Sequence, residues 1–390
     1  MTAVPRRSYE LRLGVLVSLL VLAGNVLAVS SRLGFLHKPK QVKELDHWHY
    51  LEMAKGPEGK PELTHQSTYC WRVFVPFLAR LLSRAGLSPN LAFFLITNIS
   101  LLGFLLALWA YLGALGLPLA DRVAGLALVG LTQGAVRWYE YQYWMTDPTS
   151  LFLLVLAFLL IRQGRTAALY PVSALAAFVR EHNAVVFPYY FLNAQKRGVP
   201  LARAALGTAA IAALPVAILV GLRMIIVPSQ PADLLADLAD TMGFRWRHRV
   251  DQPYQLTVGS LGVIFPLLVL FPARIPALAR RHYDQLAVVA FFYGLLAIAN
   301  NTEREIAYAL PVLLPAALRQ LGDFAREARL PAPPLLVLVV ALQLLFFFEQ
   351  RFLESGSSMY QPTNWTVVGA MGLFWLAAQA ALRWRRAPAT

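Results

Sequence analysis

Long apolar stretches recur from one end of this 390-residue chain to the other. Most run for about 15–25 residues, and an α-helix needs about 20 to cross the hydrocarbon core of a membrane. Hydrophobic residues make up 58% of the chain and charged residues only 14%, well below the roughly 25% of soluble proteins. The alternating pattern of β-barrel strands is absent. We therefore expect an all-α integral membrane protein that forms a single domain over residues 1–390.

The apolar pattern predicts about twelve spans. The first covers roughly residues 12–36, and its length favours a retained anchor over a cleaved signal peptide. Residues 167–195 are expected to form two short helices that turn at Arg180-Glu181-His182-Asn183, because a single span would place this tetrad at mid-membrane. The other spans are expected near residues 88–115, 120–136, 148–163, 204–227, 256–272, 284–299, 306–318, 332–348 and 364–382.

Basic residues concentrate in alternate loops. The two termini and the links near 117–122, 162–166, 196–203, 273–284 and 319–330 hold 18 of the 35 basic residues but only 5 of the 21 acidic ones. Short loops rich in Lys and Arg stay in the cytosol, so both termini are predicted to be cytosolic. The net charge of +14 is thereby a topology signal and does not indicate a nucleic-acid partner. The single cysteine, Cys70, excludes an internal disulfide and a cysteine metal site.

Residues 37–86 are expected to form the first exoplasmic loop, with interfacial helices on the membrane surface. One helix is predicted over the ionisable stretch 41–55, with an apolar stripe on the membrane made by Val42, Leu45, Trp48 and Leu51. Asp46 would then face away from the lipid. His47 and His49 bracket Trp48 and are expected at the interface, since a third metal ligand at a known spacing is missing. A second amphipathic helix is expected over residues 71–86.

Further ionisable clusters fall on the same predicted exoplasmic face, each near the end of an apolar helix, where a charge is costly unless a partner or ligand compensates it. They are Arg72; Arg137, Glu140 and Asp147; Arg180, Glu181 and His182; the basic run Arg245–Arg249, in an exoplasmic loop expected to end at about Gln255; and Arg304 between Glu303 and Glu305. A carboxylate facing arginines at a lipid–water boundary suits one reaction. In this reaction the carboxylate takes a proton from an acceptor hydroxyl while the arginines stabilise a phosphate leaving group.

In these motifs the chain resembles the class C glycosyltransferases (the GT-C superfamily), multi-span enzymes that use polyprenyl-phosphate or polyprenyl-diphosphate sugars. Glu44-Leu45-Asp46 matches the Glu-x-Asp motif of their first exoplasmic loop, and the following residues 49–54 are similar to the ending of many such loops. Tyr69-Cys70-Trp71-Arg72-Val73-Phe74-Val75-Pro76 resembles the Tyr-x-x-Arg-hydrophobic-x-x-Pro segment of bacterial members. Arg180-Glu181, and Arg304-Glu305 before Tyr308-Ala309-Leu310-Pro311, are also similar to features of the superfamily.

The resemblance implies an inverting enzyme of the bacterial inner membrane and cell envelope, with its active site on the exoplasmic side. Asp46 would be the general base, and Glu44 would orient it or share with it a divalent cation such as Mg²⁺ or Mn²⁺, which only some members require. The implied donor-phosphate ligands are Arg72, Arg180, His182 and Arg304, and further candidates are Asp147, Glu181, Tyr50 and His49. The donor would be a polyprenyl-phosphate sugar, and the acceptor a glycan, lipid or protein. Many members carry a soluble domain after the last span, which is not expected here.

Other interpretations of the same residues stay open. Glu44 and Asp46 also fit solvated charges on a surface helix, Arg180-Glu181 a structural ion pair, and Asp147 and Arg304 helix caps. A transporter or flippase of a lipid-linked or anionic substrate has a similar number of spans, although its charges usually lie at the midplane. In an O-antigen-ligase-type transferase, the focus would be Arg245–Arg249 and not Asp46.

Overall fold

The computed structural model of the chain describes residues 4–41, 46–65, 69–228, 234–297, 302–349 and 363–386. Every regular element in these ranges is a helix, and they contain no strand. The all-α prediction is confirmed for this part of the chain. Two compact units divide it: unit 1 comprises Met1–Val17, Leu115–Ala135 and Ala239–Thr390, and unit 2 comprises Ser18–Ala114 and Val136–Leu238. The single domain expected from the sequence stays a prediction.

Four helices are long and apolar enough to cross a membrane. They are Ser8–Leu33 within α1 (Val4–Leu33), α5 (Pro89–Ala114), α11 (Leu201–Ile225) and Trp365–Arg385 within α21 (Trp365–Arg386). A fifth span results if the bent pair Leu119–Gly130 and Gln133–Tyr141 counts as one. Two apolar helices are shorter, namely α9 (Thr166–Val179) and Ala332–Phe347 within α19 (Ala332–Glu349). These helices are those of a membrane protein, but about twelve spans are not confirmed.

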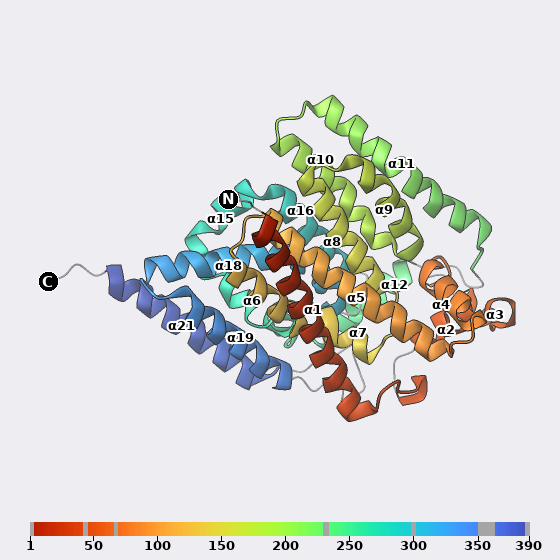
Figure 1. Cartoon of the computed structure of the whole chain (residues 1–390), viewed down its shortest axis with the longest axis horizontal. Coiled ribbons are helices and arrows are strands. Elements are labelled where there is room, and N and C mark those ends of the chain that lie inside the picture. Colours follow the sequence, from red (N-terminus) through yellow and green to blue (C-terminus); the bar gives the residue numbers. More distant parts are fainter. Residues whose placement is uncertain are drawn as a thin grey trace. The chain divides into compact units, whose positions relative to one another are not determined.

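In unit 2, α5 packs along α8 (Asp147–Gln163), α8 packs against α9, and α9 and α10 (Val186–Lys196) both pack against α11 (Figure 1). The predicted turn in residues 167–195 is confirmed. Arg180 ends α9 in an extended conformation, and a short 3₁₀ helix, η4 (Glu181–Val185), leads into α10. Asn183 stabilises this turn, because its side-chain amide donates to the Arg180 carbonyl at 3.2 Å and to Ser150 Oγ at 2.9 Å.

The loop before α5 is also built from helices: η1 (Pro39–Gln41), α2 (Asp46–Lys55), η2 (Gly56–Glu58), α3 (Pro61–Thr64) and α4 (Phe74–Arg84). α2 packs against α3 and α4, and α4 packs against α5. The predicted second amphipathic helix is α4, with Val75 and Ala79 buried and Phe77 and Leu81 exposed.

The sequence predicts α2 as a helix on the membrane surface, and in the structure it packs against other helices of its own loop. Residues 42–45 lie outside the described part of the chain, so the predicted apolar stripe is not described as a whole. The interface position expected for His47 and His49 stays a prediction; both side chains are buried in the fold, as is Tyr50. α2 is packed on several sides by its own loop, which the pattern of its own sequence does not reveal.

Unit 1 contains α6 (Leu119–Gly130), which packs against α18 (Leu310–Glu327) and α19, and α14 (Ile264–Leu268), which packs against α18 and α21. Between residues 234 and 307 the helices are α12 (Leu234–Arg247), α13 (Gln252–Tyr254), η5 (Gln255–Gly259), η6 (Pro272–Arg274), α15 (Ile275–Arg281), α16 (Tyr283–Leu295) and α17 (Thr302–Ala307). α12 occupies much of the segment expected to be an exoplasmic loop.

Two expected spans are interrupted in the structure. The span near 120–136 ends as α6, followed by a π turn, η3 (Gln133–Arg137), and a short helix, α7 (Trp138–Tyr141). The span near 256–272 breaks at Gly262, whose φ of +57° favours glycine. There Gln343 of α19 stabilises the freed backbone: its side-chain oxygen accepts a hydrogen bond from the Val263 amide at 2.8 Å.

Candidate functional site

Asp46 opens α2 and is held by a tyrosine that comes later in the same loop. The Tyr69 hydroxyl donates a hydrogen bond of 2.7 Å to Asp46 Oδ1. His49 stacks on the Tyr69 ring, with centroids 4.2 Å apart and planes 7° from parallel, and its Nδ1 is 3.0 Å from the Leu63 carbonyl, to which it donates. Burial, and then the nearby Asp46 charge, raise the pKa of Tyr69. Tyr69 therefore stays protonated and serves as a fixed donor to Asp46.

Arg72 connects this pair to the turn between α9 and α10. Its Nη1 donates to the Tyr50 hydroxyl at 3.1 Å, and Tyr50 is fully buried. Its Nη2 and Nε donate to the two carboxylate oxygens of Glu181, at 2.7 and 3.4 Å. Tyr50 in turn meets the Tyr69 ring edge-on, with centroids 5.7 Å apart. We call the contiguous set Asp46, Tyr69, Tyr50, Arg72 and Glu181 the Asp46 network.

Within the Asp46 network, Arg72 and Glu181 compensate each other's charge. Burial on its own would raise the pKa of Glu181, but the Arg72 guanidinium outweighs it and holds that pKa well below the ordinary range. The Arg72–Glu181 pair is therefore an ionised, bidentate pair. The Arg72 side chain is 7% exposed and that of Glu181 is 38% exposed. The open side of the pair is thus at Glu181.

A second ion pair lies deeper in unit 2. Arg180 pairs with Asp147 at the start of α8, and their side chains are 2% and 0% exposed. Asp147 contacts the end of α9 and not only its own helix, so its role is wider than the helix-start residue considered from the sequence. Arg180 and Glu181, considered from the sequence as a structural ion pair with each other, have other partners: Arg180 pairs with Asp147, and Glu181 pairs with Arg72.

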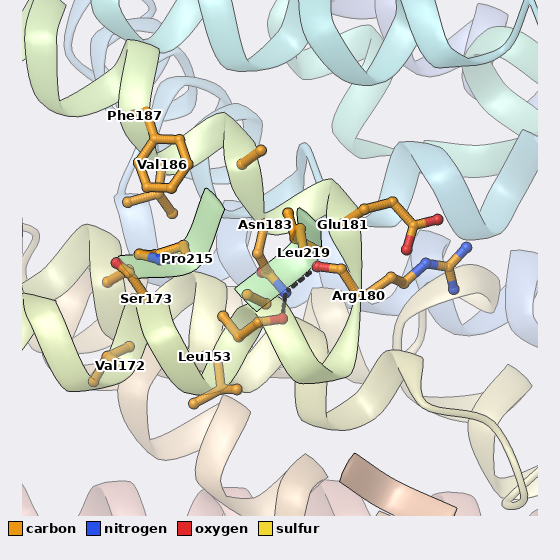
Figure 2. A pocket seen from close by; sticks show the side chains of 14 residues that line it. Leu153, Val172, Ser173, Arg180, Glu181, Asn183, Val186, Phe187, Pro215 and Leu219 are labelled. Atoms are coloured by element: carbon orange, nitrogen blue, oxygen red, sulfur yellow. Dashed lines mark hydrogen bonds between the residues drawn. The ribbon is translucent and has the colours of Figure 1, made fainter. Parts of the chain in front are cut away.

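An apolar crevice borders this turn, formed by α8, α9, α10 and α11. Figure 2 shows Val172, Pro215 and Phe187 on one side, while the Arg180 and Glu181 side chains project away from them. The crevice holds about 10 Å³, close to the space that one water molecule needs. An acyl or prenyl chain would enter only if these helices separated.

The remaining predicted residues are placed as follows. His182 follows Glu181 in η4 and is half-buried. Arg304 lies in α17 of unit 1, between the buried Glu303 and Glu305, and its role as a donor-phosphate ligand stays a prediction. Glu44 lies outside the described residues. Across the described ranges no group of three or more His, Cys, Asp or Glu side chains is arranged to hold a metal ion. A cation shared by Glu44 and Asp46 stays a prediction.

Unit 1 has a separate polar cluster around Arg245. Its Nε donates to the Leu296 carbonyl at 2.8 Å, and its Nη1 donates to Gln252 Oε1 at 2.7 Å and to Thr302 Oγ1 at 3.4 Å. Burial raises the pKa of the neighbouring Glu303 to about 7, although the Arg245 charge opposes the rise. We call Arg245, Gln252, Thr302 and Glu303 the Arg245 cluster. Of the predicted basic run, Arg247 and Arg249 are exposed.

No protein-family model matches this chain, and no curated protein matches its sequence. The resemblance set out above therefore stays an expectation. The sequence pattern predicted Asp46, Arg72 and Glu181 as candidate site residues, but it did not indicate Tyr69 or Asn183. Tyr69 was visible as the first residue of the Tyr-x-x-Arg segment. Asn183 was visible only as the last residue of the polar tetrad.

Proposed function

We propose that the chain is an integral-membrane glycosyltransferase of the class C type. It transfers a sugar from a polyprenyl-phosphate carrier to an acceptor hydroxyl on the exoplasmic face of the membrane. The observation that carries the proposal is the Asp46 network. It connects a half-buried carboxylate, through two tyrosines, to a buried arginine whose partner Glu181 is partly exposed, all within a unit that also holds apolar helices long enough to span a membrane.

Asp46 is the general base of the proposed reaction. The acceptor hydroxyl oxygen attacks the anomeric carbon and its proton passes to the Asp46 carboxylate, as the new C–O bond forms. The bond from the anomeric carbon to the phosphate oxygen breaks, and its electron pair leaves with polyprenyl phosphate. Tyr69 holds Oδ1 in place at 2.7 Å, which orients the carboxylate before the acceptor binds. A single displacement of this kind inverts the configuration at the anomeric carbon.

Arg72 stabilises the leaving phosphate. Its guanidinium already binds a carboxylate with two N–H groups, the geometry that also suits phosphate oxygens. Phosphate binding then requires Arg72 to share donors between Glu181 and the ligand, and the exposed side of Glu181 allows that approach. Arg180 acts indirectly, because its ion pair with Asp147 fixes the turn that contains Glu181.

The membrane arrangement belongs to the same proposal. About twelve spans and cytosolic termini are predicted by the apolar and charge patterns, and a bacterial inner-membrane location is what the resemblance implies. The described helices that qualify as spans support membrane insertion as such. A polyprenyl-phosphate donor fits a protein that keeps its charged network beside apolar helices, because the donor has a lipid tail and an anionic head.

The test is transfer by purified protein in proteoliposomes, with a polyprenyl-phosphate sugar as donor. Asp46→Asn keeps the shape of the side chain and its bond to Tyr69 but removes the base, so transfer should fall by about 10²–10⁴-fold. Asp121→Asn, in α6 of unit 1, is the matched control and should transfer normally. Unimpaired transfer by Asp46→Asn would remove this mechanism. Loss of transfer in Arg245→Ala alone would favour the ligase-type alternative.

A further inference from the structure

A large cavity opens on the side of α2 opposite the Asp46 network. It lies between α2, η2, α4 and the start of α5, all in unit 2, and holds about 550 Å³. That volume lies within the roughly 300–1,000 Å³ of small-ligand sites. From α2 it is lined by Trp48, Leu51, Glu52 and Lys55. These residues fall on the opposite helical face from Asp46, His49 and Tyr50, because each residue advances a helix by about 100°.

Two arginines one helical turn apart form the α4 side of the cavity. Arg80 and Arg84 line it together with Ser83, and neither arginine makes an ion pair or hydrogen bond with the described residues. The third cation, Lys55, is paired with Glu52 at 2.5 Å. Glu58 lies exposed at the rim. The two guanidinium groups therefore supply most of the unneutralised charge, which is a pattern suited to an anion.

The wall of the cavity is built to receive Arg80. A Cβ on Gly56 would lie 2.3 Å from Arg80 Cζ, so the guanidinium lies directly against a residue without a side chain. Gly56 also has a φ of +69°, which favours glycine. The next glycine, Gly59, is packed as closely, with a Cβ position 2.2 Å from the Glu52 carbonyl oxygen. The Gly59 backbone is therefore packed against α2, and the Arg80 guanidinium lies beside Gly56.

Apolar side chains flank the arginines on the outside of α4. Phe77 is 55% exposed and Leu81 is 44% exposed. On a helix, residues 77 and 81 lie next to 80 and 84, so the exposed apolar stripe and the arginine pair share an edge. This is the arrangement by which an amphipathic helix inserts apolar side chains among lipids while its basic residues hold headgroups.

From these observations we propose that the cavity between α2 and α4 binds the phosphate of an anionic membrane lipid. Arg80 and Arg84 hold the phosphate oxygens, Trp48 and Leu51 contact the glycerol region, and the acyl chains follow Phe77 and Leu81 into the membrane. This site is distinct from the Asp46 network and does not depend on the activity proposed above. It is a binding site, and its test measures binding.

The test compares lipid binding by the full-length protein and two matched double variants in detergent, using native mass spectrometry. The probes are dioctanoyl phosphatidylglycerol, dioctanoyl phosphatidylcholine and inorganic phosphate. Arg80→Gln with Arg84→Gln removes the pair. Arg162→Gln with Arg165→Gln removes two exposed arginines elsewhere in unit 2 and is the control.

We expect phosphatidylglycerol to bind the wild-type protein at least tenfold more tightly than phosphatidylcholine, because the latter carries a compensating positive charge. The Arg80/Arg84 variant should lose about tenfold in affinity for phosphatidylglycerol, and the control should lose none. Equal binding of the two lipids by wild type, or unchanged binding by the Arg80/Arg84 variant, would overturn the site. Displacement of phosphatidylglycerol by equimolar inorganic phosphate would overturn the assignment to a lipid.

Discussion

The Asp46 network of unit 2 and the Arg245 cluster of unit 1 both surround an arginine with polar groups, but the pKa values of their carboxylates shift in opposite directions. Glu181 receives two hydrogen bonds from Arg72, and its pKa is held well below the ordinary range against the effect of burial. Glu303 lies near Arg245, whose hydrogen bonds at Leu296, Gln252 and Thr302 go to neutral acceptors. Burial then dominates and raises the pKa of Glu303 to about 7. Direct pairing fixes a charge, whereas proximity alone leaves a group that titrates.

The contrast between a directly paired arginine and one bound to neutral acceptors should have its largest effect on stability, and the second ion pair of unit 2, Arg180 with Asp147, provides the test. Asp147→Ala leaves Arg180 buried without its carboxylate, and breaking a buried pair costs roughly 3–5 kcal/mol of unfolding free energy. Arg245→Met removes hydrogen bonds to neutral acceptors and should cost only about 1–3 kcal/mol. Denaturation in mixed micelles measures both. The double variant Asp147→Leu with Arg180→Met should recover most of the loss, and failure to recover would show that the pair is not the cause.

Transfer activity gives the next largest contrast. Arg72→Gln removes the cation expected to stabilise the leaving phosphate, so the transfer rate should fall by about 10²–10³-fold. Arg245→Gln should transfer at close to the wild-type rate, since its guanidinium serves local structure in unit 1. Rates are measured with folded protein in proteoliposomes. The reverse ranking of the two variants would assign the reacting centre to the Arg245 cluster.

The smallest effect is a pH dependence of opposite sign in the two units. The folded protein raises the pKa of Glu303 from 4.5 to about 7 by burial, so the folded state binds more protons between these values. The contribution of Glu303 to unfolding free energy therefore falls as the pH rises from about 4.5 to about 7. In unit 2, burial lowers the pKa of His47 from 6.5 to about 4. There the unfolded state binds more protons, so its contribution rises between about pH 4 and 6.5.

Two variants separate these contributions. Glu303→Gln should leave a stability profile that rises toward neutral pH, and His47→Gln should leave one that falls. Each difference should be at most about 3 kcal/mol over the full pH range, measured by denaturation at a series of pH values. Identical profiles for the two variants would contradict the contrast between the units.

Local patterns were enough to predict several elements of unit 2. α5, α8 and α11 match the apolar stretches expected at 88–115, 148–163 and 204–227 within a few residues. The break at the polar tetrad was predicted because four polar residues interrupt an apolar run. The interruption at Gly262 was not predicted, because it depends on Gln343, which lies 80 residues away from the amide it binds. The burial of α2 likewise depends on later segments of the loop that pack against it.

The candidate site was predictable as a set of residues but not as a set of pairs. Asp46, Arg72 and Glu181 were named from charge and motif. That Arg72 pairs with Glu181, 109 residues later, and that Arg180 pairs with Asp147, 33 residues earlier, requires the packing of α4, α8 and α9. Tyr69 was missed because a tyrosine near a predicted interface is ordinarily an anchor, and its hydrogen bond to Asp46 depends on the fold of the loop.

The central claim is that Asp46 and Arg72 act in one reaction, and a double-mutant cycle on transfer tests it most directly. Asp46→Asn, Arg72→Gln and the combined variant are compared with wild type at saturating donor. Residues that act as a unit are not additive, so the combined variant should be about as slow as the slower single variant. Wild-type transfer by Asp46→Asn, or single losses that simply multiply in the combined variant, would contradict the claim.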